Sequence, residues 1–133
     1  MVEIVIMTHG HFGEELFLSA EMILGKQGNV HSLSIAPGIA LKDVVDKLDE
    51  IILKAKAKGV LIFTDMFGGS PSNVAFSYVG QAGIEIISGV NLPMLLAAFS
   101  GRMNGQELST MAESCAEAGK NSIKVASELI QTK

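Results

Sequence analysis

Short apolar runs of strand length alternate with longer segments of helical periodicity along most of this chain. The strand-like runs are rich in β-branched residues and lie at 2–7, 30–36, 59–65 and 84–89. Helical segments are expected at 14–24, 41–58 and 74–81 and from residue 92 onward, and 122–130 is ambiguous between helix and strand. This alternation is typical of parallel strands joined by right-handed crossovers. It predicts an α/β fold.

The first and third runs are continuously apolar, which indicates strands that are buried on both faces of a sheet. We therefore expect a flavodoxin-like, doubly wound, mainly parallel sheet with the strand order 2-1-3-4. No internal repeat and no linker interrupts the pattern, so residues 1–133 are expected to form one domain.

Charge and composition exclude several classes of function. Ten Lys and Arg residues stand against fourteen Asp and Glu, with no basic cluster, which argues against nucleic-acid binding. The apolar run 90–99 is too short to span a bilayer and contains Pro93. No basic segment precedes the first apolar run, so no secretory signal is expected. A single cysteine, Cys115, allows no intramolecular disulfide and fits a cytoplasmic protein.

Two loops are predicted to meet at the carboxyl ends of adjacent strands. In the order 2-1-3-4, the ligand crevice lies between strands one and three, where the crossovers leave to opposite faces. The loop THGHFG follows the first strand and DMFGGSPSN follows the third. This topology brings His9 towards Asp65 and Ser70.

A histidine beside a carboxylate is suited to nucleophilic chemistry. If Asp65 accepts a hydrogen bond from Nδ1–H of His9, the other ring nitrogen, Nε2, keeps its lone pair and becomes a better nucleophile. The alternatives are that His9 is a turn or cap residue and that Asp65 caps a helix. No such partner is expected for His11, and His31 is expected to be structural.

The stretch GGSPSN has the composition of an anion-binding helix start. Gly68 and Gly69 allow a ligand to approach the backbone closely, Ser70 is a good N-cap, and Pro71 suits the first helical position. Free N–H groups at such a start bind phosphate. The alternative is a well-capped helix with no ligand.

Other chemistries fit the motifs less well. A G-x-S-x-G nucleophile elbow fails because Ser72 stands in place of the second glycine. Neither G-x-G-x-x-G after the first strand nor G-x-x-x-x-G-K-[ST] is present, which argues against nucleotide binding. A metal would need more ligands than His9 and Asp65, with uncertain help from His11. We expect no metal and no cofactor.

Three stretches, IVIMTHGHFGEEL, GVLIFTDMFGGSPSNVA and ISGVNLPMLL, resemble the IIA component of the mannose family of the bacterial phosphoenolpyruvate-dependent sugar phosphotransferase system (PTS). The resemblance implies that His9 is phosphorylated, that Asp65 is its hydrogen-bonded partner and that Ser70 lies beside the phosphoryl group. It also implies a homodimer with an antiparallel edge strand exchanged between subunits, which we expect within 122–130. The family has an aromatic residue at the position of His11, so His11 stays open as a second acceptor.

The implied function is a phosphoryl relay from phospho-HPr to His9 and then to the IIB component, with the membrane components IIC and IID reached only indirectly. The phosphoryl group would be held by Gly68, Gly69 and Ser70. Of four apolar residues that we expect around the site, Phe12, Met66, Phe67 and Met94, at least two should be buried. Phe12 and Phe67 are the pair that we expect to be exposed for docking.

The resemblance leaves alternative roles open. One is the IIA-like domain of a dihydroxyacetone kinase phosphotransferase subunit, and another is a regulatory copy within a transcriptional activator. A different class of function, a non-catalytic flavodoxin-like binding module, predicts that His9 is dispensable. The sugar cannot be read from the chain, because a IIA component does not contact it.

Overall fold

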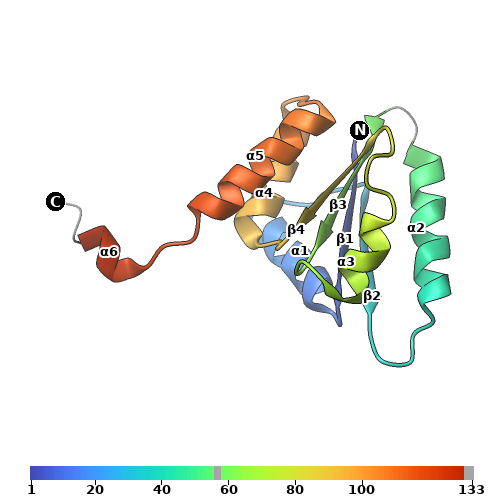
Figure 1. Ribbon diagram of the computed structural model, residues 1–133. Coiled ribbons are helices and arrows are strands. Elements are labelled where there is room, and N and C mark those ends of the chain that lie inside the picture. Colours follow the sequence, from blue (N-terminus) through green and yellow to red (C-terminus); the bar gives the residue numbers. More distant parts are fainter. Residues whose placement is uncertain (56–57, 131–133) are drawn as a thin grey trace.

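The computed structural model describes residues 1–55 and 58–130, and its centre is a four-stranded parallel sheet (Figure 1). The strands are β1 (Glu3–His9), β2 (Val30–Ile35), β3 (Val60–Thr64) and β4 (Ile84–Ser88). Their order is β2-β1-β3-β4, and all three neighbouring pairs are parallel. The predicted flavodoxin-like strand order is therefore confirmed.

Helices cover both faces of this sheet, as Figure 1 shows. On one face lie α1 (Phe12–Leu24), α4 (Leu92–Met103) and α5 (Leu108–Asn121), and on the other lie α2 (Leu41–Ala55) and α3 (Gly69–Phe76). Side chains alternate between the two cores along each strand. Ile4 and Ile6 of β1 pack towards α1 and α4, whereas Val5 and Met7 pack towards α2 and α3. All four are fully buried, which explains why this run is continuously apolar.

The third helix differs from its prediction. It begins at Gly69, five residues earlier than the predicted 74–81, and ends at Phe76. Its N-cap is Gly68, which has no side chain that could form a cap bond. Ser70 therefore lies within the first turn and is not the cap. The reason is conformational: Gly68 and Gly69 have φ of +96° and +81°, which other residues rarely adopt, and the chain turns into the helix there.

The far end of α3 is held against α2. Tyr78, just after the helix, donates a hydrogen bond from its hydroxyl to Asp49 of α2. Burial, and secondarily the hydrogen bond to Asp49, raises the pKa of Tyr78 to about 12, so the hydroxyl keeps its proton at neutral pH. The segment that begins with the two glycines is therefore anchored at its far end.

The C-terminal segment also differs from its prediction. Residues 126–130 form a short helix, α6 (Ala126–Ile130), and the predicted edge strand within 122–130 does not form in this single chain. Figure 1 shows α6 lying away from the sheet. A strand needs a neighbouring edge to pair its N–H and C=O groups, whereas a helix satisfies its own. The helix predicted to reach residue 58 ends at Ala55, and residues 56–57 lie outside the described residues.

Candidate functional site

The two residues of the predicted pair lie where the chain leaves the sheet in opposite directions. His9 is the last residue of β1, and Asp65 directly follows the neighbouring strand β3. After β1 the chain enters α1 on one face, and after β3 it enters α3 on the other. The connections therefore diverge above these two strand ends, which is where open α/β sheets place their ligands.

His9 and Asp65 are joined by two hydrogen bonds to one oxygen. Nδ1 of the His9 ring lies 2.8 Å from Oδ2 of Asp65, and the backbone N–H of His9 donates to the same Oδ2 at 2.9 Å. A carboxylate only accepts, so the ring must donate from Nδ1. In the neutral ring, Nε2 then carries a free lone pair. The His9 side chain is 51% exposed and that of Asp65 is 14% exposed, so the pair is open on the histidine side.

The carboxylate is held in its charged form. Partial burial would raise the pKa of Asp65, but hydrogen bonds from the backbone and ring of His9, with the charge of that ring when protonated, hold the pKa below its usual value. The second oxygen, Oδ1, is buried and makes no hydrogen bond with the described part of the chain. Among the described residues elsewhere in the chain, His9 is therefore the one that orients this carboxylate.

Gly69, at the start of α3, lies close to the free ring nitrogen of His9. A Cβ built on Gly69 would lie 3.1 Å from Cε1 and 3.3 Å from Nε2 of His9, whereas one built on Gly68 would meet nothing within 4 Å. Ser70 follows in the first turn and is half-buried. Unpaired N–H groups at a helix start attract anions, so a group bound to Nε2 would lie beside them.

Exposed aromatic side chains occur in both loops of the site. Phe12 begins α1, and Phe67 follows Asp65 by two residues; both are exposed, Phe67 at 77%. Met66 is exposed as well, and only Met94 is buried. The expectation that at least two of these four are buried is therefore wrong, because the loop after β3 projects outward before α3 begins. Phe67 contacts Phe76 edge to face, with ring centroids 5.6 Å apart.

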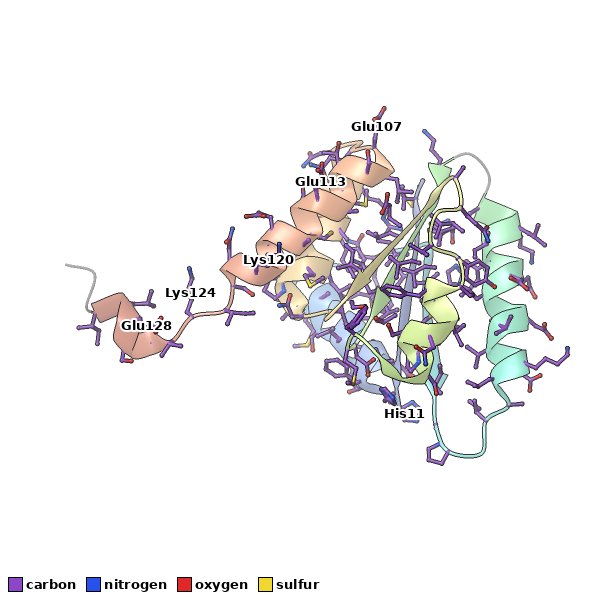
Figure 2. The ribbon with its side chains drawn as sticks, in the orientation of Figure 1. His11, Glu107, Glu113, Lys120, Lys124 and Glu128 are labelled. Atoms are coloured by element: carbon purple, nitrogen blue, oxygen red, sulfur yellow. The ribbon has the colours of Figure 1, made fainter. Side chains whose placement is uncertain are left out.

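The other two histidines are arranged differently. His11 is the N-cap of α1 without a side-chain cap bond, and its side chain is 80% exposed, 3.5 Å from Glu14. Figure 2 shows it projecting from the lower end of the molecule. His31 lies in β2, where Nε2 is 2.7 Å from Oε1 of Glu3 at the opposite end of β1. No group of three metal-binding side chains occurs among residues 1–55 and 58–130.

Sequence reasoning missed one residue next to the pair. Thr8 directly precedes His9, is buried, and accepts a hydrogen bond on Oγ1 from the backbone N–H of Gly13. The signal for it was a hydroxyl at the end of an otherwise apolar strand. Within the described ranges, no helix has the length and apolar character needed to cross a bilayer.

Comparison with known proteins identifies the family of this chain. The family model described as "PTS system fructose IIA component" matches residues 3–118. The mannose-specific EIIAB component of Escherichia coli K12 is 35% identical over 125 residues, which are 92% of this chain and 39% of that protein. The sorbose-specific EIIA component of Lacticaseibacillus casei is 32% identical over 96 residues, covering 71% of this chain and 70% of that one.

A solved structure shows the same likeness in three dimensions. The crystal structure of the phosphotransferase system component EIIA from Streptococcus agalactiae superposes with a TM-score of 0.86 at 28% identity, covering 96% of this chain and 99% of that chain. The resemblance read from the three sequence stretches is thus confirmed. This chain belongs to the mannose and fructose family of PTS IIA components.

Proposed function

We propose that this chain is a phosphocarrier that takes a phosphoryl group from phospho-HPr on Nε2 of His9 and passes it to the IIB component. The observation that carries the proposal is the hydrogen bond between Nδ1 of His9 and Asp65, which leaves Nε2 of this half-exposed side chain free beside Gly69. The chain spans 39% of the length of the E. coli relative. The partners of this chain are therefore part of the proposal and are not taken over from that protein. The chain acts as a single IIA domain, without cofactor or metal.

The transfer is a displacement at phosphorus. The lone pair on Nε2 of His9 attacks the phosphorus of the donor phosphohistidine, whose P–N bond breaks and whose nitrogen keeps the electron pair. Asp65 stabilises the positive charge that develops on the His9 ring as the new bond forms. The reverse displacement, by a histidine of IIB, then frees His9. Positioning and charge stabilisation are sufficient, because the group arrives already activated.

The phosphoryl oxygens lie at the start of α3 in this proposal. Gly68 and Gly69 leave the space beside Nε2 free of side chains, and the hydroxyl of Ser70 and the first backbone N–H groups of α3 bind the oxygens. The half-charges at a helix start favour a dianion there. Since backbone donors remain, loss of the Ser70 hydroxyl costs less than loss of Asp65.

Protein partners dock on the exposed apolar residues of the two loops. Phe12 and Phe67 form the contact surface, with Met66 between Asp65 and Phe67. Exposed aromatic residues are typical of the centres of protein interfaces. The carrier works in the cytoplasm as a homodimer and reaches IIC and IID only through IIB. The dimer is supported by the open edge of β4 and by the exposed apolar residues Ile123 and Ile130.

The test is a labelling experiment. Radiolabelled phosphoenolpyruvate is incubated with enzyme I and HPr, with and without this protein, and the label is followed in acid and in base. We expect label on this protein that is stable in base, is lost in acid, and is absent from a His9→Gln variant; label surviving in that variant would move the role to His11. A protein that takes up no label from a competent HPr would be a binding module and not a carrier. Label mapped to His31 would also overturn the proposal.

A further inference from the structure

One buried hydroxyl closes the loop that carries His9. Thr8 is 1% exposed, and its Oγ1 accepts a hydrogen bond from the backbone N–H of Gly13 at 2.8 Å. The same hydroxyl points towards the carbonyl oxygen of Gly10 at 3.5 Å. His9 lies between these contacts as the last residue of β1, and the turn that follows begins at Gly10, which has φ of +55°. The segment from residue 8 to residue 13 therefore folds back on the side chain of Thr8.

This hydroxyl replaces the missing cap of α1. His11 is the N-cap, yet its side chain makes no cap bond, so the first N–H groups of the helix depend on other acceptors. Gly13 is buried, and a Cβ on it would lie 2.8 Å from Cγ2 of Ile6 and 3.0 Å from Cγ2 of Thr8. The first turn of α1 thus rests directly on β1.

We propose that Thr8 is a positioning residue for His9. Alternation along β1 points Thr8 towards α1 and His9 towards α3, so the two neighbouring residues are fixed from opposite faces of the sheet. Asp65 binds the ring and the backbone N–H of His9, and Thr8 ties down the turn that follows. Without the hydroxyl, the buried N–H of Gly13 loses its acceptor, and residues 9–13 shift. The Nδ1–H of His9 then no longer points directly at Oδ2 of Asp65.

The experiment compares three variants that differ in which contact they lose. Thr8→Val keeps the shape and removes the hydroxyl, Thr8→Ser keeps the hydroxyl and removes the methyl group, and Ile6→Val weakens packing under Gly13 without touching the hydrogen bond. Each is examined by circular dichroism, by ¹⁵N NMR of the His9 ring nitrogens, and by single-turnover labelling from phospho-HPr. The labelling readout rests on the proposed function, whereas the ring spectrum does not.

We expect Thr8→Val to lower the labelling rate about tenfold or more, because small displacements of a reacting group have large effects on rate. Its ring spectrum should show the Nε2–H tautomer alongside the Nδ1–H form. Thr8→Ser and Ile6→Val should keep the wild-type spectrum and label at rates within about threefold of wild type.

A folded Thr8→Val protein with the wild-type ring spectrum would overturn the proposal. If wild-type protein takes up no label, the phosphocarrier function fails, and the ring spectra alone still decide the role of Thr8. If Thr8→Val does not fold, Thr8→Ala is measured in its place, since it removes the same hydroxyl with less crowding. Failure of both to fold would make the hydroxyl a requirement of the fold and would also overturn the proposal.

Discussion

Strand β1 takes part in two histidine–carboxylate pairs, one at each end. At its carboxyl end His9 meets Asp65 with Nδ1 2.8 Å from Oδ2, and at its amino end Glu3 meets His31 with Nε2 2.7 Å from Oε1. The two pairs have nearly the same length and differ in which ring nitrogen is engaged. In His9 the outer nitrogen is free, whereas in His31 the outer nitrogen is bound and only the one nearest its own backbone remains.

The surroundings of the two pairs differ as well. Glu3 also accepts a hydrogen bond from the side chain of Asn29, and Nη1 of Arg102 donates to the carbonyls of Val2 and Asn29 at 3.0 and 3.2 Å. Elsewhere in the described chain, the side-chain oxygens of Asp65 have no partner besides His9. No glycine of the described residues has His31 among the nearest neighbours of its Cβ position. A histidine–carboxylate pair therefore becomes a candidate site only where the free ring nitrogen is accessible and lies beside hydrogen-bond donors, as Nε2 of His9 lies beside the start of α3.

The largest expected contrast is between the two histidines themselves. His9→Gln should lower labelling from phospho-HPr below about one thousandth of the wild-type rate, because the nucleophile is removed. His31→Gln should label at a rate within about twofold of wild type. Both are measured by single-turnover transfer, with thermal unfolding to establish that each variant is folded. Comparable losses in both variants would show that the two pairs do not differ in function.

Loss of the charge on Asp65 should have the next largest effect. The backbone N–H of His9 donates to Oδ2, so in Asp65→Asn the amide oxygen is held on that side and still accepts from Nδ1. The tautomer is kept while the negative charge is lost. We expect transfer to slow on the order of 10²-fold, less than the roughly 10⁴-fold seen in a protease triad where the tautomer is wrong.

Two measurements separate charge from tautomer in this variant. ¹⁵N NMR of the ring should still show Nδ1–H in Asp65→Asn, and Asp65→Ala, which loses the acceptor too, should be slower than Asp65→Asn. Transfer by Asp65→Asn at the wild-type rate would show that Asp65 only orients the turn.

Alanine at Gly69 should change the transfer rate less than loss of the Asp65 charge does, and Gly68→Ala serves as its control. Both have positive φ, so alanine is strained at either position, but only at Gly69 would the new Cβ crowd Nε2 of His9. Gly69→Ala should slow transfer about tenfold more than Gly68→Ala, because it narrows the approach to the nucleophile. The free energy of unfolding of each variant is measured as well, to show that the strain of alanine at positive φ destabilises both proteins to a similar extent. Equal rates would mean that the phosphoryl group does not pass beside Gly69.

The smallest expected effect concerns stability at the other end of β1. Partial burial would raise the pKa of Glu3, but hydrogen bonds from Asn29 and His31 and the charges of His31 and Arg102 hold it below its usual value. Such a carboxyl stabilises the folded protein above its unfolded-state pKa and loses that contribution as the pH falls through the folded-state value.

Glu3→Gln should therefore lower the free energy of unfolding by about 1 kcal/mol at pH 7. The gap to wild type should close as the pH falls below about 4.5, where Glu3 becomes protonated in the unfolded chain. Denaturant titrations at pH 7 and pH 3 measure it. Glu14→Gln serves as the control, because the Glu14 side chain is 54% exposed and its contact with His11 should contribute almost nothing. A gap that stays constant with pH would show that Glu3 acts through packing alone.

Much of the fold was predictable because the apolar pattern reports burial directly. Continuous apolar residues in β1 and β3 indicated a sheet covered on both faces, and the strand order then brought His9 next to Asp65 from 56 positions away in the chain. The start of α3 was not predictable in the same way. Gly68 and Gly69 begin the helix through positive φ, which no hydrophobic pattern records.

A further feature depends on contacts that a sequence does not display. The hydroxyl of Thr8 has its role because α1 returns over β1 and presents the N–H of Gly13. Residues 126–130 are helical in this single chain, and the edge strand expected within 122–130 was to be exchanged with a second subunit, so it stays a prediction. The role of Thr8 was missed because its cause is tertiary.

The length of β1 has a consequence for the electrostatics of the phosphorylated protein. A seven-residue strand spans about 20 Å, which is more than twice the distance of about 8 Å over which physiological salt screens a charge. His31 lies opposite Val5, four residues or about 13 Å along the strand from His9, and its ring is bound to Glu3 at the far end. A dianion arriving on His9 should therefore be only weakly felt at Glu3 and His31. The ring signals of His31 would stay in place while those of His9 move, so the far end of the same strand supplies an internal reference for following phosphorylation in the intact protein.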